Sequence, residues 1–92
     1  MWHRLDEPAV ISYYKNGDIN YKIYYENGKA YRLDGPAYIH YHENGNINSE
    51  EYYAYDKKHR LDGPADIYYY DNGNILHKKY YIDNREYIPH NN

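Results

Sequence analysis

The stretch Tyr31-Arg32-Leu33-Asp34-Gly35-Pro36-Ala37 decides the fold, because the chain contains it in two further versions, His3–Ala9 and His59–Ala65. The three versions are spaced by 28 residues, and the Asn-Gly pairs at Asn16, Asn44 and Asn72 keep the same spacing. Self-similarity at a fixed period is the signature of a repeat architecture. The sequence therefore predicts one domain over residues 1–92, with units at 3–30, 31–58 and 59–86 and a C-terminal cap at 87–92.

Each unit carries the alternation of β-strands. Ala37, Ile39 and Tyr41 alternate with more polar residues, and the same pattern recurs one unit earlier and one unit later. The Asn-Gly pair that follows predicts a hairpin with a type I′ turn, in which both central residues have positive φ. On the return strand, Ile19 and Tyr24 fall on opposite faces of an unbroken strand. This indicates either a β-bulge or a sheet that is partly covered on both faces.

No segment has a helical period, so the expected fold is all-β: an elongated antiparallel meander of three 28-residue hairpin repeats in one open sheet. A single hairpin cannot bury a face alone, and its neighbours in the row complete the core. The recurring Ile and Tyr columns are expected on one face. Asn and charged residues are expected in the turns and on the other face.

The segment Tyr13–Ile19, with the pattern Tyr-Tyr-x-Asn-Gly-x-Ile, and the segment Tyr24–Lys29 resemble the variant MORN (membrane occupation and recognition nexus) repeat. The Arg-Leu-Asp-Gly-Pro-Ala extension is similar to units of bacterial, phage and giant-virus repeat proteins. The resemblance covers residues 3–86 and implies an open sheet of stacked hairpins. MORN proteins are scaffolds, so it also implies membrane, lipid or protein association, including self-association, rather than catalysis.

Composition narrows the function classes. The chain has 11 basic and 14 acidic residues, a formal charge of −3 and no cysteine, which excludes disulfides and thiolate metal sites. No apolar run approaches the roughly 18 residues of a membrane span, and no signal peptide is expected, so the predicted location is the cytoplasm, that of the host if a phage encodes the chain. Direct nucleic-acid binding would need a basic stripe. The acidic balance suits a protein that occupies a basic, nucleic-acid-binding surface of another protein.

Histidine does not predict a metal site. His40 and His42 share a face of an expected strand, but the equivalent columns hold Tyr68 and Tyr14 in other units. A position where His and Tyr interchange favours a flat, amphipathic ring over a ligand. Neither a metal, a cofactor nor a catalytic residue is predicted, because no carboxylate, serine or histidine has a distinctive context.

The pairs Arg4–Asp6, Arg32–Asp34 and Arg60–Asp62 recur in every unit. Two interpretations exist: a row of arginines for anions, or charge-assisted hydrogen bonds that hold each turn. The second is favoured because an aspartate recurs beside every arginine.

Charge also diverges between units. Lys22 and Lys78 occupy the column of Glu50, so the middle unit is locally acidic. We predict an acidic contact patch of Glu43, Glu50 and Glu51. The alternative is a Lys–Glu–Lys ladder in which opposite charges favour the register.

Seventeen tyrosines exceed what so small a core needs. Tyrosine is enriched in protein interfaces because it gives contact area at a low entropic cost. The predicted aromatic binding face comprises Tyr14, Tyr24, Tyr38, Tyr52, Tyr68, Tyr70 and Tyr80. The alternative is that outer tyrosines brace a thin sheet.

The predicted function is a non-catalytic protein-binding repeat module. In its sharpest form it is a small phage or mobile-element inhibitor of a host defence protein, which it blocks by covering a nucleic-acid-binding surface. Two alternatives are a MORN-type lipid-associating or self-assembling scaffold and carbohydrate binding by tyrosine stacks. Open sheet edges accept further strands, so a homodimer through these edges is also expected.

Overall fold

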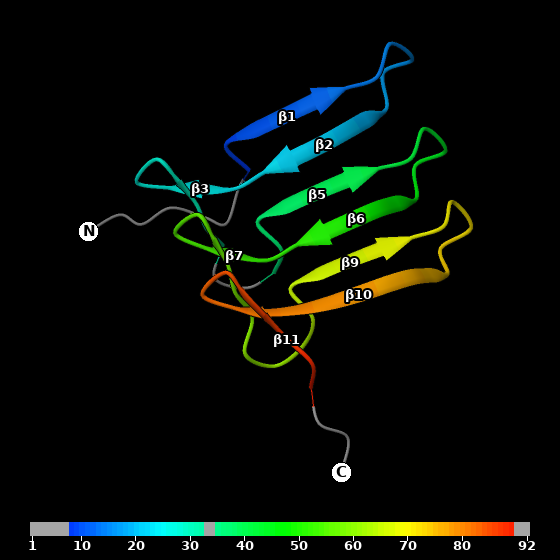
Figure 1. Cartoon of the computed structure of the whole chain (residues 1–92). Coiled ribbons are helices and arrows are strands. Elements are labelled where there is room, and N and C mark those ends of the chain that lie inside the picture. The colour runs from blue at the N-terminus through cyan, green and yellow to red at the C-terminus, as the bar shows by residue number, and fades with distance from the viewer. Residues whose placement is uncertain (1–7, 33–34, 90–92) are drawn as a thin grey trace.

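The computed structural model describes residues 8–32 and 35–89, which form antiparallel strands and no helix (Figure 1). The prediction of an all-β fold with an open antiparallel sheet is confirmed. No helix in these residues has the length and apolarity that crossing a bilayer requires. The predicted turn at Glu7 lies outside the described residues.

Seven of the described strands form one sheet in the order β1-β2-β5-β6-β9-β10-β11. Their bounds are β1 Val10–Tyr13, β2 Ile19–Ile23, β5 Tyr38–Tyr41, β6 Ile47–Glu51, β9 Asp66–Tyr69, β10 Ile75–Ile82 and β11 Arg85–Tyr87. Two small hairpins follow β2 and β6: β3 (Tyr25–Glu26) with β4 (Lys29–Ala30), and β7 (Tyr53–Ala54) with β8 (Lys57–Lys58). Strand β10 is unbroken; its first part pairs with β9 and its end with β11.

The molecule is a broad, thin slab of 44 × 42 × 18 Å. The expected elongated shape is wrong because the two long dimensions are nearly equal. The small hairpins lie at the end of the sheet opposite the Asn-Gly turns and extend the molecule along the strand direction (Figure 1). The main sheet is therefore no wider across its strands than the strands and small hairpins are long.

A β-bulge interrupts the return strand of each main hairpin. Ser12 pairs with Tyr21 and Tyr13 pairs with Ile19, so Asn20 is an extra residue in β2. The same slip leaves Asn48 extra in β6 and Leu76 extra in β10. The bulge that the Ile19–Tyr24 parity indicated is confirmed.

The Asn-Gly turns differ from the predicted type I′. Gly17 has a φ of 95° whereas Asn16 is not among the residues with positive φ. Gly17 donates its N–H to the Tyr14 carbonyl at 3.0 Å, and Asn16 Oδ1 accepts the N–H of Asp18 at 2.9 Å. This is the geometry of a type I turn followed by a glycine in the left-handed region. The small hairpins use type I′ turns instead, such as Asn27 (φ 53°) and Gly28 (φ 79°).

The cross-strand register mixes apolar and charged residues on both faces. One row crosses the sheet as Ile11, Lys22, Ile39, Glu50, Ile67 and Lys78, and we call its side the isoleucine face. The adjacent row, Ser12, Tyr21, His40, Ser49, Tyr68 and His77, lies on the opposite face because side chains alternate along a strand. The predicted separation of Ile and Tyr from charged residues is therefore wrong. In a single-layer sheet most side chains on both faces are only partly buried, so neither face has to be wholly polar.

The core is small and lies where a main hairpin meets its small hairpin. Tyr24, Ala37 and Ile39 form its buried centre, with Tyr41 and Ile47 packed around them. In the described residues no large side chain is fully buried. Contacts between neighbouring units therefore have to supply much of the stability.

One such contact is a clamp between successive small hairpins. Asp56 donates its N–H to the Ala30 carbonyl at 3.0 Å, and its Oδ1 accepts the Ala30 N–H at 2.6 Å. Asn84 repeats both bonds with Lys58, at 2.8 and 2.9 Å. Both clamp residues have a φ of 71°, a region that Asn and Asp tolerate better than most residues. The residue at the same place in the β3–β4 turn is Gly28, which has no side chain to make the second of these bonds.

The clamp predicts the response to substitution at residue 56. Asp56→Ala is expected to lower the free energy of unfolding by about 2 kcal/mol, since it removes a hydrogen bond and places Ala in the left-handed region. Asp56→Asn keeps both features and should stay within about 0.5 kcal/mol of the parent. Urea denaturation measures both, and equal stabilities of the two variants would refute the clamp.

Candidate functional site

The strongest candidate site is a strip of five rings on the face opposite the isoleucine face. We define the aromatic strip as Tyr21, Tyr38, His40, Tyr68 and His77. Tyr38 stacks on His40 with ring centroids 4.6 Å apart, and Tyr21 lies 5.6 Å from His40 and 6.1 Å from Tyr38. Tyr68 and His77 form a second group at 4.7 Å. The rings come from β2, β5, β9 and β10, so the strip crosses the sheet.

Ser49 joins the two groups of rings. It lies between His40 and Tyr68 in the register and is buried. The tyrosines of the strip are half-buried. Burial is the main cause that raises the pKa of Tyr38 and of Tyr68, and the charge of the Glu51 carboxylate is the second. The strip thus presents amphipathic rings with part of each ring in solvent.

The seven tyrosines predicted as one binding face do not share a face. Tyr38 and Tyr68 belong to the aromatic strip, whereas Tyr24 is buried in the core. Tyr14 donates its hydroxyl to the Tyr41 carbonyl at 2.7 Å, and Tyr70 is exposed near a turn. Tyr52 and Tyr80 are half-buried beside Arg60 and Tyr87, respectively. The sequence missed Tyr21 and His77, whose positions follow only from the bulged register.

The predicted acidic patch is likewise dispersed. Glu50 and Glu51 are adjacent in β6, so their side chains point to opposite faces. Glu50 accepts a hydrogen bond from the Tyr69 hydroxyl at 2.6 Å, and Glu51 accepts one from the Tyr53 hydroxyl at 2.9 Å. Glu43 lies in an exposed turn at the far end of β5. The structure therefore does not bring the three carboxylates into one surface.

The alternative charge ladder is not formed by direct neighbours either. In the register Ile39 stands between Lys22 and Glu50, and Ile67 stands between Glu50 and Lys78. Opposite charges are thus two strands apart, roughly 9–10 Å.

His42 and Tyr14 show why His and Tyr interchange. His42 Nε2 lies 3.2 Å from the Tyr69 carbonyl oxygen, as the Tyr14 hydroxyl lies 2.7 Å from that of Tyr41. Both side chains thus bridge to the carbonyl 27 residues later. Within residues 8–32 and 35–89, no three His, Asp or Glu side chains gather as metal ligands would.

A second feature is a stack of tyrosine, guanidinium and glycine. The Arg60 guanidinium lies 4.0 Å from the Tyr52 ring centroid, and Arg32 lies 3.9 Å from that of Tyr24. Arg60 also donates to the Pro64 carbonyl at 3.1 Å and to Asp62 at 3.1 Å. The turn-holding role predicted for Arg60 and Asp62 is therefore confirmed, and the ring contact adds to it.

Glycine closes the other side of each stack. A Cβ at residue 63 would lie 2.9 Å from the Arg60 guanidinium carbon, and one at residue 35 would lie 3.2 Å from that of Arg32. The Gly in Asp-Gly-Pro therefore leaves space for the guanidinium. The recurrence of Tyr24 and Arg32 in fixed columns was the sequence signal for this contact.

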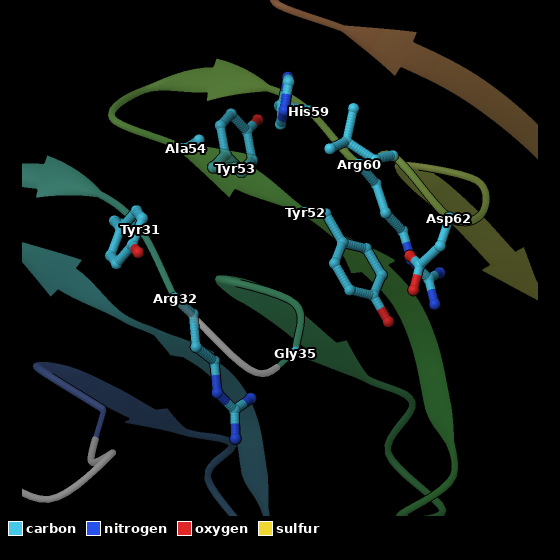
Figure 2. A pocket seen from close by; sticks show the side chains of 10 residues that line it. Tyr31, Arg32, Gly35, Tyr52, Tyr53, Ala54, His59, Arg60 and Asp62 are labelled. Carbon is cyan, nitrogen blue, oxygen red and sulfur yellow. The ribbon is translucent and has the colours of Figure 1, made fainter.

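An open groove of about 740 Å³ lies beside the Arg60–Tyr52 stack and extends to Arg32 (Figure 2). Arg32, Tyr52 and Arg60 line it together with His59 and the exposed Leu61. Asp62 offsets part of its positive charge through the ion pair with Arg60. The groove mixes rings, cations and one carboxylate, without a nucleophile–base pair.

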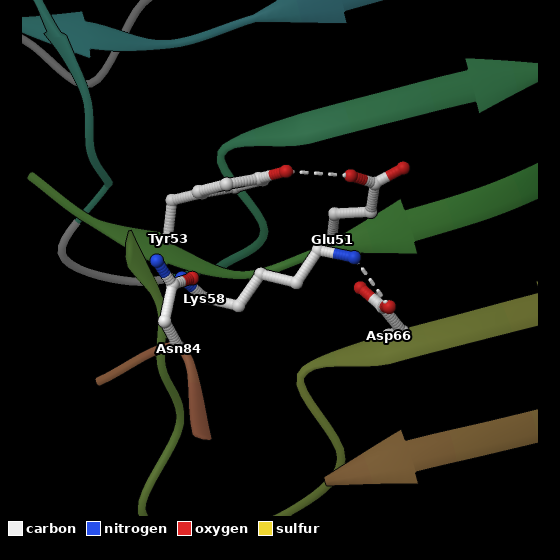
Figure 3. Close-up of polar contacts among 5 residues, drawn as sticks. All are labelled: Glu51, Tyr53, Lys58, Asp66 and Asn84. Atoms are coloured by element: carbon white, nitrogen blue, oxygen red, sulfur yellow. Dashed lines mark hydrogen bonds and ion pairs between the residues drawn. The ribbon is translucent and has the colours of Figure 1, made fainter. Parts of the chain in front are cut away.

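An ion pair between the half-buried Lys58 and the buried Asp66 fixes the junction between the second small hairpin and the sheet. Lys58 Nζ lies 2.7 Å from Asp66 Oδ2, next to the Tyr53–Glu51 hydrogen bond (Figure 3). Burial lowers the pKa of Lys58, but the bond to Asp66 and its charge raise it more, so the net pKa lies above 10.5. Asp66 is almost fully buried, and its Oδ1 has no partner in the described part of the chain.

These features define a single-layer, antiparallel β-protein that displays a strip of aromatic rings. No protein-family model, curated protein or solved structure matches the chain.

The guanidinium stack predicts that Arg60 resists conservative exchange. Arg60→Lys is expected to cost about 1 to 2 kcal/mol of unfolding free energy, because lysine lacks the planar group that stacks on Tyr52 and bonds to Pro64 and Asp62. Arg85→Lys, at the exposed first residue of β11, is the matched control and should change stability by less than about 0.5 kcal/mol. Equal effects in thermal or urea unfolding would contradict the stack.

Alkaline pH should unfold the protein in a particular window. Burial, then the hydrogen bond and charge of Glu50, raises the pKa of Tyr69 from 10.0 to about 12. Unfolded tyrosine ionises first, so the stability contribution is complete below pH 10 and is lost as pH rises towards about 12. Lys58, whose folded pKa is also raised, acts in the same direction.

Absorbance of tyrosinate and circular dichroism, followed together against pH, measure this effect. Tyr69→Phe should reduce the alkaline loss of stability, whereas Tyr70→Phe, at an exposed ring, should not. Ionisation of every tyrosine near pH 10 with the sheet intact would show that the expectation is wrong.

Proposed function

We propose that this chain is a non-catalytic protein-binding module whose binding surface is the aromatic strip. The observation that carries the proposal is the ring-to-ring continuity of Tyr21, Tyr38 and His40 on a sheet face. Rigid, half-exposed rings give contact area at a low entropic cost, which is typical of protein interfaces. A flat row of rings on an open sheet also suits a broad partner better than a small substrate.

The strip is freer to bind than the other candidates. The carboxylates of Glu50 and Glu51 already accept tyrosine hydroxyls, and Arg60 already holds its turn. Ligand binding there would compete with contacts that support the fold. Ring faces on the strip carry no such bonds to lose.

The finer proposal is that three MORN-like hairpin units build this surface and that the module acts as an inhibitor. The 28-residue period and the strand starts at Val10, Tyr38 and Asp66 support the repeat. The formal charge of −3 supports a basic partner surface, such as the nucleic-acid-binding face of a defence protein in a phage host.

The test is retention of host-lysate proteins on the immobilised chain, compared with a variant that loses the strip. Tyr21→Ser with Tyr68→Ser is suitable because Ser49 and Ser12 already occupy these two columns in other units. The double variant should fold and bind a stoichiometric partner at least about tenfold more weakly. Tyr25→Ser, at an exposed ring on β3, is the matched control and should bind normally.

Equal retention by the double variant and the parent would refute the strip as the binding surface. Retention of anionic liposomes or of a glycan, lost in the same variant, would instead transfer the strip to the lipid or carbohydrate alternative. Each outcome requires that circular dichroism shows a folded sheet.

A further inference from the structure

The two outer edges of the main sheet expose residues that the interior buries. Ile39 and Ile67 are each 8% exposed, whereas Ile11 of the same row, on the edge strand β1, is 40% exposed. At the other edge Ile75 of β10 is 50% exposed, whereas the equivalent Ile19 and Ile47 are half-buried. Repeat proteins normally close such ends with polar capping units.

We propose that copies of this chain associate head to tail, with β10 of one copy pairing antiparallel to β1 of the next. The two edges are complementary because they repeat strands that already pair inside the molecule. Strand β1 repeats β5 and β9, and the first part of β10 repeats β2 and β6. The junction between copies would then be a further β2–β5 or β6–β9 boundary.

The interior boundaries fix the register of this junction. Lys22 pairs with Ile39 between β2 and β5, and Glu50 pairs with Ile67 between β6 and β9. One unit further, Lys78 pairs with Ile11 of the next copy. Its neighbours follow in the same register: His77 with Ser12 and Lys79 with Val10.

Side chains near the turns complete the match. Tyr14 and His42 each bridge to a carbonyl 27 residues later. Tyr70 is the third member of this column and is 52% exposed. In the head-to-tail register its hydroxyl meets the carbonyl of Tyr13 in the next copy, and Tyr13 is itself 59% exposed.

The Asn side chains of the turn follow the same rule. Asn44 and Asn46 both donate to the Asp71 carbonyl, at 2.9 and 2.8 Å. Asn72 and Asn74 repeat them in the third unit and face the carbonyl of Lys15 in the next copy.

The junction is weaker than an interior boundary in one respect. Asp56 and Asn84 clamp the preceding small hairpin through their side chains, but the equivalent residue at the start of the next copy is Gly28. One side-chain hydrogen bond is therefore missing between copies. Association should accordingly be reversible and depend on concentration.

Head-to-tail pairing is heterologous, so it does not close on itself as a two-fold dimer does. The alternative pairing of β10 with a second β10 would place Lys78 and Lys79 against like charges, which is destabilising. Pairing of β1 with a second β1 brings Ile11 beside its own copy and leaves β10 free. These alternatives make different predictions for charge exchange at residues 11 and 78.

Sedimentation velocity over a range of concentrations tests the proposal with three variants of the full chain. Ile11→Lys places a lysine opposite Lys78 of the neighbouring copy, in addition to Lys22 of its own β2, and should weaken association at least about tenfold. Ile11→Lys combined with Lys78→Glu creates a Lys–Glu pair across the junction and should restore association. Leu61→Lys, at a 75% exposed side chain in the loop between β8 and β9, is the matched control for added charge and should behave as the parent.

A parent protein that sediments as a monomer at every concentration overturns the proposal. A closed dimer that Ile11→Lys weakens, and whose association Lys78→Glu does not restore, also overturns it. The second result assigns the interface to paired β1 strands. Circular dichroism shows whether each variant is folded, and Val10→Lys, opposite Lys79, replaces Ile11→Lys if that variant does not fold. His77 of the aromatic strip lies at the junction, but Tyr21 and Tyr68 pair only inside the molecule, so the Tyr21→Ser, Tyr68→Ser variant should still associate.

Discussion

A sheet without a second layer has to gain its stability from lateral contacts between one hairpin and the next. The molecule is 18 Å thick in its thinnest direction, and its most buried apolar residues, Ala37 and Ala65, are small. Burial of such side chains contributes little free energy. The hydrogen bonds from Tyr14 to Tyr41 and from His42 to Tyr69 therefore supply an important part of the stability, although they are few. The arrangement of rings on the outer surfaces follows from the same constraint.

Lateral contacts are kept even where residue identities change. Tyr31 stacks on Tyr55 with ring centroids 4.6 Å apart. One unit later, His59 and Asp83 occupy these columns, and the Asp83 N–H lies 3.1 Å from the ring nitrogen Nδ1. A ring stack is thus exchanged for a polar pair at the same boundary. Both pairs join successive small hairpins, and aromatic residues are one way of making this contact.

The period, the strand class and the bulge could be predicted because each depends on spacing along the chain. The type I′ expectation at Asn16 failed because a bulge at Asn20 changes the loop that the hairpin needs. The candidate surfaces failed for a different reason. Adjacent residues such as Glu50 and Glu51 point to opposite faces. Arg32 contacts Tyr24 only because the small hairpin between them in the sequence folds back. Alternation alone does not tell which face of a single layer remains open.

The local range of the lateral bonds determines the order in which the chain can fold. In the described residues, hydrogen bonds between units span at most 27 residues and join only neighbouring units. None of these bonds joins the first main hairpin to the third, so the sheet can grow by adding one hairpin at a time. The middle hairpin is held from both sides, while each outer hairpin is held from one. Amide hydrogens of β5 and β6 should consequently exchange most slowly, and opening should begin at the edges.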